Sequence, residues 1–168
     1  MLRNNLGFTL QEVVVVITLM GILSVAAAPQ IINLNSDARV ATLHGIQDSI
    51  AGANNIIYSK AAANGQQRQT NSSLTIGSGN TSSQINIGHG YLTADIANLA
   101  KVLDANIAGH LDSAITQAKA DWIITSNSHS DDTLIIRQNG APETDCHLVY
   151  TQATATSTPN FTLNTKGC

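Results

Sequence analysis

The chain has 168 residues and a formal net charge of −3, with charged and aromatic side chains making up only 11% and 4% of it. This length favours one small globular domain and leaves little room for a second. The eight Lys and Arg residues form no basic stripe along the sequence, which argues against a nucleic-acid-binding protein.

Residues 8–28 follow a seven-residue leader and form an apolar run of 21 residues. As a helix this run is about 31 Å long, which matches the hydrocarbon core of a bilayer. Only Glu12 carries a charge within it, and a carboxylate inside a membrane helix needs a partner. We expect that partner to be a backbone amine, created by cleavage between Gly7 and Phe8 and offered by a neighbouring subunit.

Two simpler interpretations of this segment remain as alternatives. A secretory signal peptide also starts with a basic residue, here Arg3, and residues 26–28 are small enough for its cleavage site. The apolar run is longer than that class requires, and Glu12 interrupts it. A plain single-span anchor explains the length but gives Glu12 no role. We therefore favour a helix that both anchors and assembles the chain.

Residues 29–60 are predicted to continue this helix as an amphipathic segment. Apolar residues recur there at spacings of three and four, which places them on one face: Leu43, Ile46, Ile50, Ala53 and Ile57. Pro29 lacks an N–H group, so we expect the helix to kink or loosen there. A helix from Phe8 to about Lys60 is too long for a small globule to bury. Its first half must be covered by lipid and later by sister helices.

Residues 61–121 are predicted to be a connecting region with short helices. Its polar, Gly-containing first part predicts one weak hairpin. Thr93 or Asp95 is the expected N-cap of a second helix that ends near Gly109, and a further helical turn is expected within residues 111–119. The helical spacing comes from Leu92, Ile96, Leu99 and Leu103.

Residues 122–168 change to patterns that predict strands, with a turn at residues 128–132. The segments are WIIT, TLIIR, CHLVYTQAT and NFTLN. A long helix followed by strands indicates an α+β fold, with an antiparallel sheet across the apolar face of the helix.

Cys146 and Cys168 are the two cysteines of the chain. An exported protein matures in an oxidising space, so a disulfide that bounds a C-terminal loop is expected, with two free thiols as the alternative. In the chain-entropy model, closing a loop of this size stabilises the fold by about 3.4 kcal/mol.

No pattern in the sequence points to catalysis, a metal or a cofactor. The five histidines lack the spacing of a metal-binding pair, and Asp131 with Asp132 lacks the alternating pattern of a calcium loop. We therefore expect a non-enzymatic protein. The contrasting hypothesis, an anchored envelope enzyme or binding module, requires a pocket of convergent polar groups for which the sequence has no signature.

The spacing of Gly7, Phe8, Glu12 and Pro29 resembles the leader and N-terminal helix of type IV pilins. In that family a prepilin peptidase cuts after the Gly and methylates the new N-terminal Phe. The resemblance assigns these roles to Gly7 and Phe8, and it assigns subunit assembly to Phe8, Glu12 and Pro29, with Glu12 taking part in docking. Gln11 departs from the family, whose members usually have an apolar residue at this position.

The sequence from Pro29 to Gly65 is similar to the mannose-sensitive haemagglutinin (MSHA) branch of these pilins, as are the Asp121-Trp122 pair and the two-cysteine end. The resemblance implies a long helix whose second half lies on a C-terminal sheet. It also implies an inner-membrane precursor that the assembly machinery, with minor pilins, builds into a helical filament of identical subunits for attachment at the cell surface. The alternative within the superfamily is a pseudopilin of a type II secretion system, against which the terminal cysteines weigh.

Overall fold

A computed structural model describes residues 8–77, 79, 82–109, 114–126 and 132–168. The leader, including Arg3 and Gly7, lies outside the described residues, as does the predicted turn at residues 128–132 apart from its last position. The chain divides into two units, Met1–Ala38 and Arg39–Cys168. Each unit is described by itself below.

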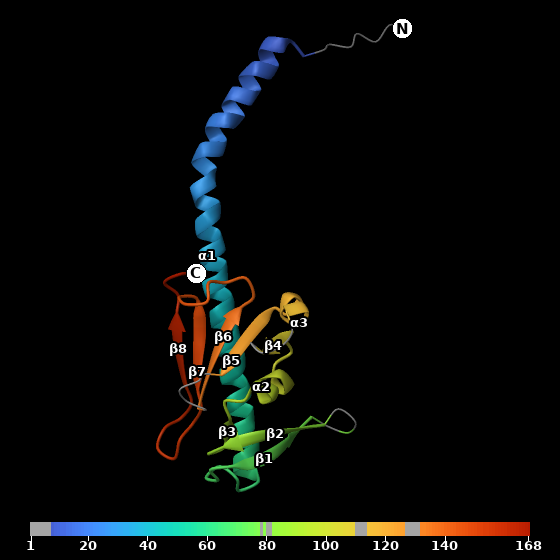
Figure 1. The fold of residues 1–168 in the computed structure, drawn as a ribbon, viewed down its shortest axis with the longest axis vertical. Coiled ribbons are helices and arrows are strands. Elements are labelled where there is room, and N and C mark those ends of the chain that lie inside the picture. Colours follow the sequence, from blue (N-terminus) through green and yellow to red (C-terminus); the bar gives the residue numbers. More distant parts are fainter. Residues whose placement is uncertain (1–7, 78, 80–81, 110–113, 127–131) are drawn as a thin grey trace. The chain divides into compact units, whose positions relative to one another are not determined.

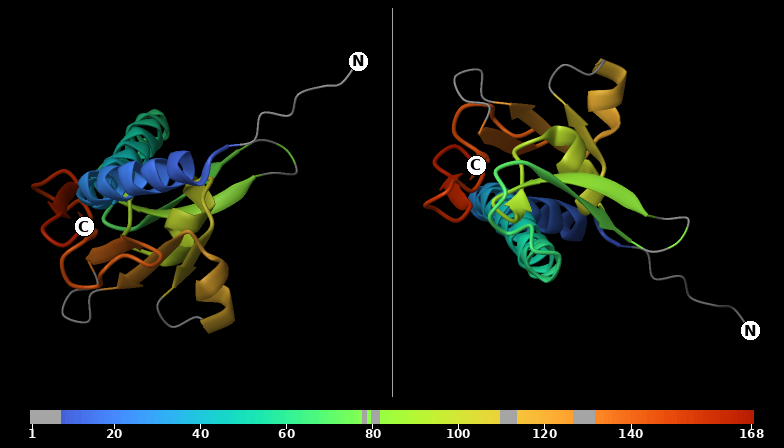
Figure 2. Two further views of the ribbon diagram at one scale, coloured as in Figure 1. Left: turned by 90° about the horizontal axis from the view of Figure 1, so that it is seen from above. Right: turned by 90° about the horizontal axis from the view of Figure 1, so that it is seen from below.

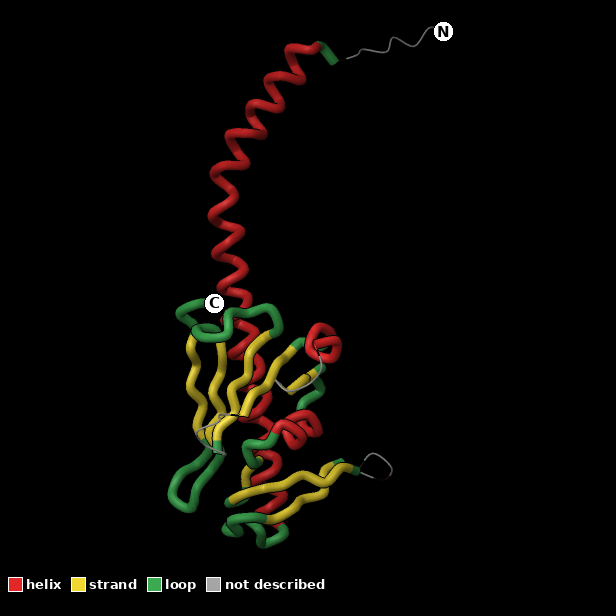
Figure 3. The backbone as a smooth tube through the Cα atoms, in the orientation of Figure 1, coloured by secondary structure: helices red, strands yellow, loops and turns green. Residues whose placement is uncertain are grey.

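Helix α1 extends from Leu10 to Ala63, close to the predicted bounds (Figures 1 and 3). The backbone stays helical at Pro29, so the expected loosening does not interrupt the helix. Lys60 lies in the last turn, where a positive charge interacts favourably with the helix dipole. Within the described residues, no helix combines the length and the apolar character needed to cross a membrane.

The second unit contains two sheets and two short helices besides its part of α1. A three-stranded antiparallel sheet has the order β1-β2-β3, and a five-stranded sheet has the order β4-β5-β6-β7-β8. The strands are β1 (Ser72–Ile76), β2 (Ser83–Gly88), β3 (Tyr91–Leu92), β4 (Ile107–Gly109), β5 (Trp122–Ser126), β6 (Thr133–Gln138), β7 (His147–Thr151) and β8 (Asn160–Asn164). The helices are α2 (Ile96–Val102) and α3 (Ala114–Lys119).

The core of this unit lies between α1 and the two sheets, and the teal part of α1 runs along both sheets in Figures 1 and 2. Leu43, Ile46, Ile50 and Ile57 of the predicted apolar face are buried. Ala53 is only partly buried, and its neighbour Asn54 is buried instead. The α+β fold with a long helix against a sheet is thereby confirmed.

The prediction for the connecting region needs two corrections. Asp95 caps α2, accepting a hydrogen bond from the Ala97 N–H at 3.0 Å, but the helix ends at Val102 instead of near Gly109. Residues Ile107–Gly109 form β4, which pairs parallel with β5. The five-stranded sheet is therefore mixed and not wholly antiparallel. The backbone of β4 is hydrogen-bonded to β5, which lies about 15 residues further along the chain. The helical spacing of nearby apolar residues cannot reveal this pairing.

A buried polar network joins α1 to both sheets. The Tyr150 hydroxyl donates to the Leu92 carbonyl at 2.6 Å and accepts from Asn54 Nδ2 at 3.4 Å. Asn54 Oδ1 accepts from the Leu92 N–H at 3.0 Å. Burial raises the pKa of Tyr150 to about 12, and the hydrogen bond from Asn54 opposes that rise.

Candidate assembly site

The first turn of α1 forms a capping box. Thr9 precedes the helix, and its N–H and hydroxyl groups both donate to Glu12 Oε2 at 2.8 Å. The Glu12 N–H donates back to Thr9 Oγ1 at 3.3 Å. Reciprocal bonds of this kind satisfy helix N–H groups that have no partner within the helix, and the carboxylate complements the positive end of the helix dipole.

Thr9 is a partner of Glu12 that was not predicted from the sequence. Glu12 was expected to find its partner only in an amine, whereas Thr9 already supplies two donors within the same chain. The signal was present as Thr-x-x-Glu immediately before an apolar run. Pairing of Glu12 with a neighbour's Phe8 amine stays a prediction, as does the assembly role of Pro29.

The apolar side chains of the first unit are uncovered in the single chain. Between Phe8 and Val25 the large apolar side chains are 46% to 85% exposed, with Val14 at the low end and Phe8 at the high end. An apolar helix surface on all sides is typical of a helix that is covered by lipid or by other helices. The predicted span over residues 8–28 ends in residues whose side chains lie outside the description, and it stays a prediction.

Polar side chains within this surface are mostly satisfied by the helix itself. The Thr18 hydroxyl bonds to the Val14 and Val15 carbonyls, and the Ser24 hydroxyl bonds to the Met20 carbonyl at 2.7 Å. Gln11 is exposed, and its amide forms no hydrogen bond with any described residue. Gln11 is therefore the polar side chain of this segment that has no hydrogen-bond partner among the described residues.

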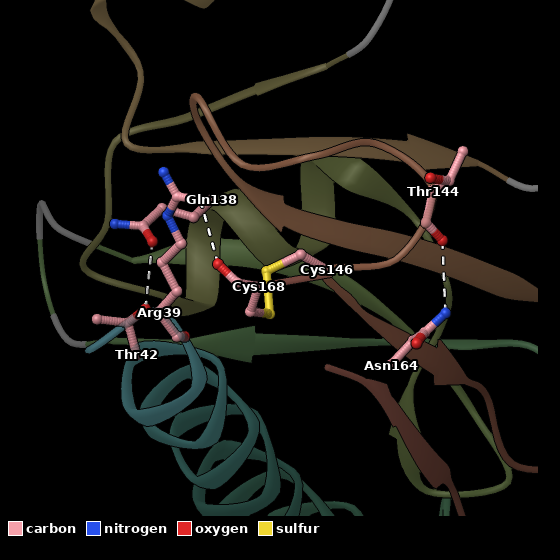
Figure 4. Close-up of a disulfide and its surroundings, with 7 residues drawn as sticks. All are labelled: Arg39, Thr42, Gln138, Thr144, Cys146, Asn164 and Cys168. Carbon is pink, nitrogen blue, oxygen red and sulfur yellow. Dashed lines mark hydrogen bonds between the residues drawn. A yellow bond between two sulfur atoms is a disulfide. The ribbon is translucent and has the colours of Figure 1, made fainter. Parts of the chain in front are cut away.

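The second unit holds the predicted cysteine pair, which forms a disulfide (Figure 4). Cys146 immediately precedes β7 and is buried, and three bonds hold the last residues of the chain in place. Besides the disulfide, Arg39 Nη1 donates to the Cys168 carbonyl at 3.3 Å, and the Gly167 N–H donates to the Asp145 carbonyl at 2.9 Å. A Cβ at position 167 would lie only 2.6 Å from the Asp145 Cβ, so this close approach requires glycine.

The site residues thus fall into two groups. Phe8 and Glu12 belong to the first unit, whereas Cys146 and Cys168 belong to the second. Gly7, the predicted cleavage residue, lies outside the described part. No group of three or more His, Cys, Asp or Glu side chains suited to a metal ion occurs among the residues that the structure describes.

Comparison with known proteins identifies the N-terminal segment. No curated protein and no solved structure shows significant similarity to the chain. Residues 2–28 match the family model described as the prokaryotic N-terminal methylation motif, and this match includes the Gly7-Phe8 junction and Glu12. The chain therefore carries the N-terminal methylation motif of prokaryotic pilin-type proteins, the class of type IV pilins and pseudopilins that are anchored in the membrane before assembly.

Proposed function

We propose that this protein is a structural subunit of a type IV pilus of the MSHA type. It is held in the inner membrane as a precursor, cut after Gly7 by a prepilin peptidase, and polymerised into a surface fibre for attachment. The observation that carries the proposal is the first half of α1, which has an exposed apolar surface and a capped carboxylate, Glu12, four residues beyond the motif's Phe8.

The exposed apolar side chains support exchange of lipid for sister helices. Lipid tails are as apolar as these side chains, so packing between helices must come from close van der Waals contact and polar bonds. Gly21 suits close packing between helices because it has no side chain. Its position faces open space in the single chain, since a Cβ there would meet no atom within 4 Å. Small residues at such positions let two helices approach closely.

The Glu12 carboxylate supports a docking role because hydrogen bonds hold it in place without a charged partner in its own chain. Its two hydrogen bonds from Thr9 hold it at the start of the helix, next to Phe8. Cleavage after Gly7 would give Phe8 a free amine, and a Glu12 side chain from an incoming subunit can pair with that amine in a medium of low dielectric. Repeated head-to-tail docking need not close, so it can build an open helical filament.

The disulfide supports a fibre subunit over a type II secretion pseudopilin. Cys146 and Cys168 bound a C-terminal segment, and this two-cysteine end is one of the features that resemble fibre pilins. The fold and the methylation motif are common to both alternatives, so this choice rests on the C-terminal segment and on the similarity of residues 29–65 to the MSHA branch.

The test is assembly by variants of Glu12 in a strain that lacks the native gene. Glu12→Val removes both the cap and the charge, whereas Glu12→Gln keeps an oxygen that can accept from Thr9 and removes only the charge. Loss of a desolvated charge pair typically costs 2 to 5 kcal/mol, so we expect at least about tenfold fewer filaments from both variants by electron microscopy. Both variants should still enter the membrane.

Mass spectrometry of the mature wild-type chain supplies the second measurement. An N-terminal, methylated Phe8 is expected. A mature chain that retains Met1, or that begins after residue 27 or 28, would contradict the proposed processing. Normal filaments from Glu12→Gln would refute the charge pair, even if cleavage occurs as expected.

A further inference from the structure

A groove of about 530 Å³ on the second unit is lined by residues that play no part in the assembly site. Its walls come from the end of α1, the segment that follows α1, the turn between β2 and β3, and the loop between β7 and β8. A groove of this volume falls within the range of small-ligand sites. Among the described residues that line it, none is acidic.

Two stacked tyrosines form the aromatic wall of the groove. The rings of Tyr58 on α1 and Tyr91 on β3 are 4.8 Å apart between centroids and inclined by 20°. Gly90 makes this approach possible, because a Cβ there would lie 2.9 Å from Tyr58 Cδ2 and its φ of +84° favours glycine. Tyr58 remains 38% exposed, so part of its ring is open to a ligand.

The polar wall contains hydrogen-bonding groups that are not committed elsewhere. Arg68 is exposed, and its guanidinium forms no hydrogen bond or ion pair with any residue in the described part of the chain. Gln67 also lines the groove, although its Oε1 atom, which has no hydrogen-bond partner among the described residues, is buried and not open to a ligand. His89 has a φ of 52°, which is uncommon outside glycine, and its N–H holds this conformation by donating to the Gln69 carbonyl at 2.7 Å.

We propose that this groove binds a saccharide that carries carboxylate groups. An aromatic face is electronegative and attracts the C–H groups on the flat face of a sugar ring, while planar amide and guanidinium groups bond to its hydroxyls. In the loop at residues 154–158 the hydroxyls of Thr154, Thr156 and Ser157 bond to one another, so Thr158 is the residue that adds a further hydroxyl to the rim. Arg68 favours an acidic sugar because its fork of donors matches a carboxylate, and no lining carboxylate of the described residues repels it.

The test measures binding to the full chain in detergent micelles, so it requires no filament and is independent of the assembly proposal. The probes are the trimer of galacturonic acid and the neutral trimer of galactose, titrated by saturation-transfer NMR. The wild-type protein is expected to bind the acidic trimer roughly tenfold more tightly than the neutral one. Arg68→Gln should remove this preference, and Tyr58→Leu should weaken binding of both trimers by about tenfold.

Two control variants distinguish binding in the groove from general effects of charge and of folding. Lys166→Gln makes the same charge change at an exposed position outside the groove, and Ile56→Ala alters an exposed side chain of the same helix. Both should leave binding unchanged. The proposal is overturned if the folded wild-type protein binds neither trimer, if Lys166→Gln weakens binding as much as Arg68→Gln, or if inorganic phosphate displaces the acidic trimer as completely as an equal concentration of unlabelled trimer.

Discussion

The two halves of α1 share one helix and differ in what they bury. Before residue 39 the large apolar side chains whose exposure is described are uncovered in the single chain, as Val16 is at 47%. After residue 39 apolar residues recur on one face, where Leu43, Ile50 and Ile57 are buried, while Ile56 on the other side is exposed. Both halves contain many apolar residues, so their periodicity, and not their amount, indicates which half packs within its own chain.

Polar residues show the same contrast. Glu12 in the first half is satisfied by Thr9, three residues away in its own helix. Asn54 in the second half is satisfied by Leu92 and Tyr150, which belong to separate sheets. The first half therefore bonds its one carboxylate locally and keeps its surface for other molecules, whereas the second half uses a polar side chain to fix the domain.

The largest expected effect comes from trimming one side chain in each half. Ile50→Ala removes a side chain that is 1% exposed, and we expect it to lower the free energy of unfolding by about 2 to 5 kcal/mol. Val16→Ala should change it by less than about 0.5 kcal/mol. Denaturant titration of the full chain in detergent, followed by Trp122 fluorescence, measures both. Similar losses in the two variants would contradict the conclusion that only the second half of α1 packs within its own chain.

The next largest effect is a loss of stability at high pH that comes from Tyr150, whose buried hydroxyl bonds to Asn54. The native state keeps the Tyr150 proton up to a pKa of about 12, compared with an ordinary value of 10. Below pH 10 both states hold this proton, and stability does not change with pH through Tyr150. Between pH 10 and about 12 the native state binds more protons than the unfolded state. Stability should therefore fall by about 3 kcal/mol in total.

Two variants isolate this pH dependence. Tyr150→Phe should remove the Tyr150 part of the loss above pH 10. It should also lower stability by about 1 to 3 kcal/mol at neutral pH, because the Leu92 carbonyl and the Asn54 amide lose a buried partner. Tyr58→Phe removes a partly exposed phenol and serves as the control, which should keep the decline. An equal decline in both variants would show that Tyr150 is not its source.

The sequence predicted those features whose cause is local. The spacing of Leu43, Ile46 and Ile50 predicted the buried face of α1, and the start of α2 was predicted with two candidate N-caps, Thr93 and Asp95, of which Asp95 is the cap. The strand at Ile107–Gly109 was missed because its stability depends on pairing with β5, which no local pattern encodes.

The assembly site at Glu12 could be predicted from the local sequence, whereas the groove beside Tyr58 could not. Glu12 was identified from its place in an apolar run, and its partner Thr9 was readable three residues earlier. The wall made by Tyr58 and Tyr91 was not readable, since it depends on a contact between residues 33 positions apart and on the small size of Gly90. Similarly, Asn54 resembles an ordinary surface residue until the fold brings Tyr150 against it.

The smallest expected effect lies in the first turn of α1. Thr9→Val removes the hydroxyl that accepts from the Glu12 N–H, and loss of an N-cap typically costs about 1 kcal/mol. Amide hydrogen exchange at Glu12 and Val13 should become roughly fivefold faster in detergent. Thr18→Val is the control, because the carbonyls that its hydroxyl contacts already lie within the helix.

The effect of Thr9→Val on the second unit tests whether the cap acts only locally. If the first half completes its bonds locally, Thr9→Val should leave the unfolding of the second unit unchanged, as reported by Trp122. A faster exchange at Glu12 together with a lower unfolding midpoint of the second unit would instead show that the cap contributes to the stability of the domain. The contrast between the two halves of α1 would then have to be abandoned, even though their exposed surfaces differ.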